Sequence, residues 1–185
     1  MHIEVSHDDM QRFRRRLQLL YPDQVDDALE RLRMVFGRYG VGVDKRDAGE
    51  RWNQQDIVLI TYADMVQSDE TQPLEALTKF ATQHLHGAVK TVHLLPFCPW
   101  TSDDGFSVAN YRQVHPDYGE WKHIDTLGQH FELMFDLVLN HCSSENLWFR
   151  QFIQGNQPGR FYFIEEATET DLSQVVRPRT SPLLT

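Results

Sequence analysis

The feature that most constrains the fold of this chain is the run Leu133–Leu139, which is apolar at every position except Asp136. A short run that is apolar on consecutive positions is typical of a strand buried on both faces, as in a parallel sheet covered by helices. The run stops at Asn140–His141, and α/β proteins bind ligands at the carboxyl ends of parallel strands. We therefore predict a buried strand over residues 133–139 with a ligand site at its carboxyl end.

Two earlier segments also have the composition of buried strands. Ile57–Tyr62 is rich in β-branched residues, and Val89–Leu95 is apolar and ends at Pro96. Apolar residues at helical spacing predict a helix that begins at Pro73 and a second helix over Trp121–His130. The resulting order of strand, helix, strand, helix and strand predicts a parallel sheet with right-handed crossovers.

The segments outside this pattern differ from it in composition. Residues 8–39 have the apolar spacing of two helices, which we interpret as an appended hairpin, and residues 43–55 have the polar composition of a linker. After the third strand we expect a short amphipathic helix over Leu147–Ile153 and a short strand over Arg160–Ile164.

The composition limits the class of partner and the compartment. Lys and Arg number 18 and Asp and Glu number 27 in 185 residues, so the net charge is -9. Nucleic acids and anionic membranes bind basic patches, and we expect neither as a partner. Only two cysteines occur and no signal peptide is visible, which favours a reducing, cytoplasmic setting. No apolar run approaches the roughly 20 residues of a transmembrane helix.

Polar and aromatic residues follow all three predicted strands. Asp64 follows the first, Asp103 and Phe106 lie in the long Phe97–Gly119 loop after the second, and Asn140–His141 follow the third. Carboxylates accept hydrogen bonds from vicinal hydroxyl groups, an aromatic face packs on a sugar ring, and a neutral histidine can donate to a hydroxyl. These residue types predict a sugar site where the strand ends converge.

Each of these residues also has a purely structural explanation. A single histidine at a strand end is commonly a hydrogen-bonded structural residue, and Asp104-Gly105 is a turn signal. An unpaired carboxylate inside an apolar run costs roughly several kcal/mol, so Asp136 needs a partner whether it contacts a ligand or braces the loops. His84 and His86 lack the spacing of a zinc-binding helix, and we expect no metal and no cofactor.

Several segments together resemble a known family. Asp136–His141 matches the D-x-x-x-N-H motif on the third barrel strand of the glycoside hydrolase 13 (α-amylase) superfamily. Segments that are similar to the sucrose phosphorylase subfamily are Leu59–Asp64, His93–Phe97, Asp103–Phe106 and Arg177–Arg179. Segments most similar to the glucosylglycerate phosphorylases of that subfamily are Arg51–Trp52, Pro99–Val108 and Arg179–Thr185.

The resemblance implies a TIM (β/α)8 barrel, of which this chain supplies the first three strands. We therefore expect an incomplete α/β barrel, and we expect the chain to be the N-terminal portion of a larger protein. The expected domains are a helical extension and linker over 1–52, three βα units over 53–145, and the start of an inserted loop domain over 146–185.

The resemblance also implies roles for individual residues. Asp103 matches an aspartate that bonds the glucosyl hydroxyls, Phe106 matches an aromatic residue beside that ring, and His141 matches a histidine that bonds a hydroxyl near C6. Asp136 and Asn140 match motif residues that are mainly structural.

Two arginines extend this set toward the acceptor. Arg177 and Arg179 match loop arginines that shape the acceptor or phosphate subsite, and guanidinium groups suit a phosphate or a glycerate carboxylate. Without the resemblance, both would be interpreted as solvated loop charges.

The activity that the resemblance implies is that of an α-glucosyl phosphorylase, a glycosyltransferase acting on a small glucoside and inorganic phosphate with retention of configuration. The family's catalytic carboxylates lie on strands four, five and seven, so we assign no catalytic residue here and expect the chain alone to be inactive. The alternatives are a hydrolase or transglucosidase of the same superfamily, or a non-catalytic sugar-binding fragment. The identity of the acceptor and the oligomeric state stay open.

Overall fold

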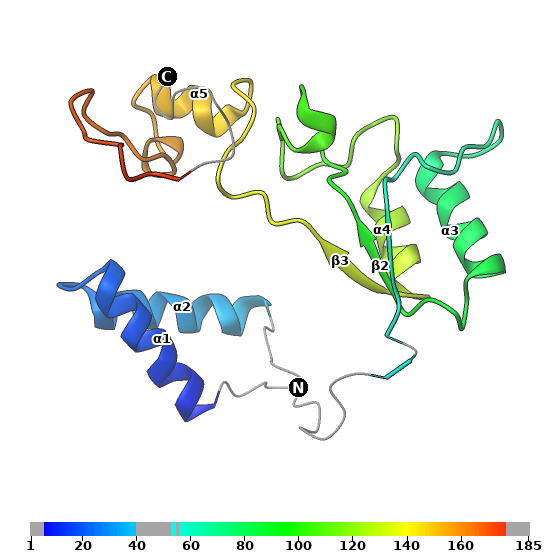
Figure 1. The fold of residues 1–185 in the computed structure, drawn as a ribbon, viewed down its shortest axis with the longest axis horizontal. Coiled ribbons are helices and arrows are strands. Elements are labelled where there is room, and N and C mark those ends of the chain that lie inside the picture. The colour runs from blue at the N-terminus through cyan, green and yellow to red at the C-terminus, as the bar shows by residue number, and fades with distance from the viewer. Residues whose placement is uncertain (1–5, 40–52, 55, 177–185) are drawn as a thin grey trace. The chain divides into compact units, whose positions relative to one another are not determined.

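The computed structural model describes residues 6–39, 53–54 and 56–176. The chain divides into two compact units, Met1–Asn53 and Gln54–Thr185, and Figure 1 labels their α-helices and the strands β2 and β3. No helix in the described ranges has both the length and the apolar character needed to cross a bilayer.

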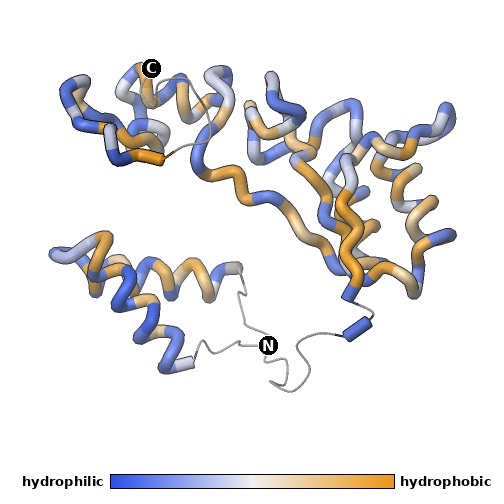
Figure 2. Tube along the Cα trace, viewed as in Figure 1, coloured by the Kyte–Doolittle hydropathy of each residue, from blue (hydrophilic) through white to orange (hydrophobic). Residues whose placement is uncertain are grey.

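The first unit is a helical hairpin made of α1, His7–Leu20, and α2, Val25–Tyr39. The Ser6 side chain caps α1 by accepting a hydrogen bond from the Asp9 amide. Hydrophobic and hydrophilic segments alternate along both helices (Figure 2), and the Phe13 and Phe36 rings meet at 5.4 Å between their centroids. The predicted hairpin is therefore confirmed.

The second unit contains a three-stranded parallel sheet in the order β1-β2-β3 (Figure 1). The strands are β1, Val58–Thr61, β2, Thr91–Leu94, and β3, Glu132–Phe135. The crossover helices are α3, Pro73–His84, and α4, Trp121–Gly128. The predicted order of strands and helices and the α/β fold class are confirmed, and each strand is shorter than its apolar run.

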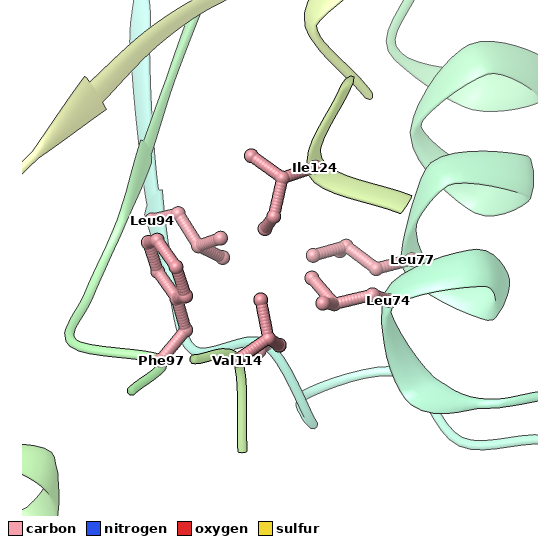
Figure 3. Close-up of a cluster of buried hydrophobic side chains, with 7 residues drawn as sticks. Leu74, Leu77, Leu94, Phe97, Val114 and Ile124 are labelled. Atoms are coloured by element: carbon pink, nitrogen blue, oxygen red, sulfur yellow. The ribbon is translucent and has the colours of Figure 1, made fainter. Parts of the chain in front are cut away.

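The core of this unit lies between the sheet and the two crossover helices. Figure 3 shows Leu74 and Leu77 of α3 and Ile124 of α4 pointing toward Leu94 of β2. Leu74 and Leu94 have no exposed surface, so the hydrophobic contribution of each is close to the maximum for a leucine, about 2 kcal/mol or more. A second cluster of Ala81, Val92, Leu127 and Phe131 extends the core toward the amino ends of the strands.

The opposite face of the sheet is uncovered among the described residues. The register pairs Ile60 with His93 and His93 with Met134, which places these three residues on that face. Ile60 is 62% exposed and Met134 is 45% exposed. Their apolar side chains indicate that the sheet is one wall of a larger structure.

The prediction that the third strand is buried on both faces over residues 133–139 is wrong for this chain. β3 ends at Phe135, and Leu137 and Leu139 beyond it are 79% and 78% exposed. The physical reason is that β3 has one neighbour, β2, in the described sheet and no layer over its second face. Residues 136–139 thus have the composition of a buried strand but lack the contacts that would continue β3 through them.

Beyond β3 the chain forms α5, Leu147–Ile153, as predicted, and a 3₁₀ turn η2, Gly159–Phe161. The short strand expected over Arg160–Ile164 is wrong. Its aromatic residues pack on α5 instead of pairing with a strand, since the Phe163 ring lies 5.3 Å from that of Phe149 and 5.0 Å from that of Phe152.

Candidate functional site

The long loop after β2 is held closed by its own backbone. An isolated antiparallel bridge joins Trp100 to Val108, and the Thr101 amide donates to the Ser107 carbonyl at 3.1 Å. The tip of the loop, Asp103–Gly105, is a single 3₁₀ turn called η1. These bonds make the loop an ordered projection that carries the predicted residues Asp103 and Phe106 at its tip.

The turn at the tip uses left-handed backbone conformations in succession. Asp103 and Asp104 have φ angles of 60° and 48°, and Gly105 has a φ of 98°. Aspartate tolerates this region better than most residues, and glycine enters it without steric cost. A Cβ on Gly105 would lie 2.8 Å from the carbonyl oxygen of Pro96, the residue that follows β2 closely. The tip is therefore packed directly on the carboxyl end of β2.

The segment after β3 is joined to this loop by buried polar contacts. The Ser143 amide donates to the Val108 carbonyl at 3.0 Å, and the Thr101 and Ser143 hydroxyl oxygens lie 2.8 Å apart. The buried Asn146 side chain donates to the same Val108 carbonyl at 3.3 Å and accepts from the Trp148 amide at the start of α5. The carboxyl ends of β2 and β3 thus lead into one connected structure.

Asp136 has a defined partner on the neighbouring strand. Its carboxylate lies 2.9 Å from Nε2 of His93, and the two side chains are 28% and 18% exposed. Both lie at the carboxyl end of the sheet on its uncovered face. This contact meets the requirement for a partner that the sequence places on Asp136.

The structure brings the predicted residues of two loops into the same region. Asp103 and Phe106 flank Gly105 in the β2 loop, and His141 is exposed two residues before Ser143, which bonds that loop. Asn140 is exposed in the same segment. Arg177 and Arg179 lie outside the described residues. The roles of all these side chains toward a ligand stay predictions.

Sequence reasoning missed the residues that join the two loops. Thr101, Ser143 and Asn146 make the connecting hydrogen bonds, and short polar residues in loops carry no pattern that distinguishes them from solvated ones. The Tyr111 hydroxyl also bonds the segment after β3. Its place in an aromatic-rich loop is the one signal that could have pointed to it.

The described residues contain no group of three or more His, Cys, Asp or Glu side chains arranged to hold a metal ion. A cavity of about 560 Å³ lies on the helical side of the unit between α3 and α4 and is lined by residues such as Thr78, Lys79 and Lys122. None of the described candidate site residues lines this cavity.

Two thiols beside the site lead to a pH prediction. Burial raises the pKa of Cys98 and of Cys142, so the folded chain keeps protons that the unfolded chain loses. The folded state is therefore most stable, as far as these thiols are concerned, below the unfolded thiol pKa of about 8.5. Its stability decreases as the pH rises above that value. We expect the free energy of unfolding to fall as the pH rises above about 8.5, by at most about 1.4 kcal/mol per pH unit for each thiol.

Urea unfolding of the chain at several pH values tests this expectation. The Cys98→Ala and Cys142→Ala proteins are the matched comparisons, since each removes one titrating thiol. A decrease of the same slope in both variants and in the unchanged chain would contradict the assignment.

The sequence matches one family model and is similar to proteins of known function. Residues 85–180 match the family model described as alpha amylase, catalytic domain. The glucosylglycerate phosphorylase of Escherichia coli strain K12 is 47% identical over 136 residues, covering 74% of this chain and 24% of that protein. The glucosylglycerate phosphorylase of Allomeiothermus silvanus is 41% identical over 169 residues, covering 91% of this chain and 30% of that protein.

A solved structure shows the same fold. The sucrose 6F-phosphate phosphorylase from Thermoanaerobacter thermosaccharolyticum superposes with a TM-score of 0.50 at 26% identity, covering 58% of this chain and 21% of that chain. The chain spans 24% and 30% of the length of these two curated relatives.

Proposed function

Because the chain belongs to the α-amylase catalytic-domain family, we propose that it forms the N-terminal part of an α-glucosyl phosphorylase of the sucrose and glucosylglycerate phosphorylase type. Such an enzyme moves a glucosyl group from a small α-glucoside to inorganic phosphate with retention, giving α-glucose 1-phosphate. Relatives named as glucosylglycerate phosphorylases, at 47% and 41% identity, support this choice within the family.

The observation that carries the proposal is the connected pair of loops at the carboxyl end of the sheet. The Thr101–Ser143 contact at 2.8 Å joins the loop of Asp103 and Phe106 to the segment of His141. Loops at the carboxyl face of parallel strands are where barrels of this kind build their active sites. A carboxylate, an aromatic ring and an imidazole from these loops would together hold one glucosyl ring.

In this proposal the chain supplies binding and orientation and no bond-breaking group. Asp103 and His141 hold hydroxyl groups of the glucosyl ring, Phe106 packs beside the ring, and Asp136 and Asn140 brace the β3 end. Arg177 and Arg179 would bind phosphate or an acidic acceptor through bidentate hydrogen bonds. The nucleophile and the acid/base are to be supplied by later strands of the complete protein.

The setting of the enzyme is also part of the proposal. We place it in the cytoplasm, where its two free cysteines would stay reduced, with a glucoside and phosphate as its small-molecule partners. The acidic net charge of -9 does not favour nucleic acid or an anionic membrane as a further partner.

The test measures what the complete protein releases from α-glucosides. The complete protein is incubated with glucosylglycerate or sucrose, with and without inorganic phosphate. We expect glucose 1-phosphate with phosphate and little free glucose without it, because phosphate replaces water as the second nucleophile. Equal release of free glucose in both buffers would contradict the proposal and favour a hydrolase.

A further inference from the structure

One side chain connects the β2 loop directly to the backbone around His141. The Tyr111 hydroxyl lies 2.9 Å from the Val138 carbonyl and 3.1 Å from the His141 carbonyl. Carbonyls only accept hydrogen bonds, so the single hydroxyl proton is shared between the two carbonyls in a bifurcated hydrogen bond. It therefore bridges the stretch from Val138 to His141, the candidate sugar contact.

The ring of Tyr111 is itself held in place. It stacks on Trp148 of α5 with centroids 5.6 Å apart and an angle of 13° between the planes. The Arg112 guanidinium lies 5.8 Å from the centre of the same indole, and the Tyr162 ring meets that indole edge-on at 5.2 Å. Aromatic and cation–π contacts of this kind stabilise the position of the ring beyond the effect of burying its surface.

The state of the hydroxyl suits this role. Burial raises the pKa of Tyr111, so the phenol keeps its proton and remains a donor throughout the neutral range. The segment that it holds needs such support, because residues beyond Phe135 have left the β ladder and Leu137 and Leu139 on either side of Val138 are exposed.

We propose that Tyr111 is a positioning residue of the sugar site, whose hydroxyl fixes the backbone of residues 138–141 and thereby the direction in which the His141 side chain projects. The inference rests on the proposed function, in which His141 contacts the glucosyl ring. Small displacements of a group that orients a substrate have large effects on rate. Tyr111 acts through His141 and does not itself touch the substrate.

The first test reports on the segment without reference to activity. In the complete protein, Tyr111→Phe retains the ring and its stacking and removes the donor. Alkylation of Cys142, the residue after His141, is followed by mass spectrometry of its peptide. We expect its rate to rise about fivefold, the effect of losing one hydrogen bond of average strength. The rate at Cys98 should change by less than about twofold.

The second test asks whether the effect passes through His141. We expect Tyr111→Phe to lower kcat/KM for phosphorolysis about tenfold in the unchanged protein, and less than about twofold in a His141→Ala background, because residues that act together are not additive. Tyr118→Phe is the matched control. Its hydroxyl lies in the same loop and accepts only from Trp100 at 3.4 Å among the bonds of the described residues, and its kcat/KM should stay unchanged.

The outcomes separate this inference from the proposed function. Equal losses from Tyr111→Phe in both backgrounds, or equal increases in alkylation at both thiols, would overturn the positioning role and leave the phosphorylase proposal intact. An unchanged kcat/KM in His141→Ala would overturn the role of His141 and this inference with it. An absence of phosphorolysis in the unchanged protein, with free glucose released instead, would contradict the proposed function itself.

Discussion

Replacement of Asp103 by asparagine should lower kcat/KM for the glucosyl donor by about 10²- to 10³-fold in the complete phosphorylase. The carboxylate is proposed to accept charge-assisted hydrogen bonds from glucosyl hydroxyls, which are about twice as strong as neutral ones. The amide has the same shape, loses the charge and presents a donor where an acceptor is needed. Both kcat and KM are measured by coupling glucose 1-phosphate release to a spectrophotometric assay.

The neighbouring residue provides a matched control for this substitution. Asp104 is also exposed and also has a positive φ, of 48°, and asparagine tolerates that conformation as well as aspartate does. Asp104→Asn should therefore change kcat/KM by less than about threefold, the usual range for a surface substitution. Equal losses in the two proteins would show that the loop is sensitive to charge in general and would contradict a specific contact at Asp103.

Replacement of Gly105 by alanine should have the second large effect. The φ of 98° at this position costs an alanine about 1–3 kcal/mol, and its Cβ would meet the Pro96 carbonyl at 2.8 Å and the Pro96 Cβ at 3.2 Å. Because the contact is with backbone, the loop must move away from the end of β2, which adds about 1–3 kcal/mol. We expect a total loss of about 2–6 kcal/mol in the free energy of unfolding.

The same movement would carry Asp103 and Phe106 away from the site. We expect the KM for the glucosyl donor to rise together with the loss of stability, measured by urea unfolding and by steady-state kinetics on the same protein. Gly87→Ala is the control, because Gly87 has a φ of 81° with nothing within 4 Å of an added Cβ. The Gly87→Ala protein carries only the cost of a positive φ at an alanine, so its free energy of unfolding should fall by about 1 kcal/mol with no change in KM. A Gly105→Ala protein that behaves like Gly87→Ala would contradict the close packing on Pro96.

The parts of the fold that depend on local pattern could be predicted from the sequence. The strand-helix alternation, the Pro73 start of α3 and the α5 helix all follow from apolar spacing and helix-start chemistry. The end of β3 could not be predicted in this way. An apolar run indicates that a strand is buried. Where the strand ends depends on the neighbouring strands that pair with it, and these are set by the tertiary structure.

The candidate site also has parts that the sequence could predict and parts that it could not. The types of residue at the strand ends, such as Asp103 and His141, were visible in the sequence because carboxylate, aromatic and imidazole groups are informative. The contacts that connect the two loops were not visible, because Thr101 and Ser143 are common in any loop and lie 42 positions apart. The partner of Asp136 was required by electrostatics, and its identity as His93 depends on the parallel register of β2 and β3.

The uncovered face of the sheet has a consequence for the synthesis of the protein. Translation proceeds from the N-terminus, so Ile60, Met134 and the unpaired side of β3 leave the ribosome before any later residue that could cover them. During that interval the nascent chain presents an apolar wall, with Ile60 62% exposed, next to an open strand edge, which is the combination that recruits foreign strands. In the complete protein that we propose, we expect this apolar wall to stay prone to aggregation until later strands cover it.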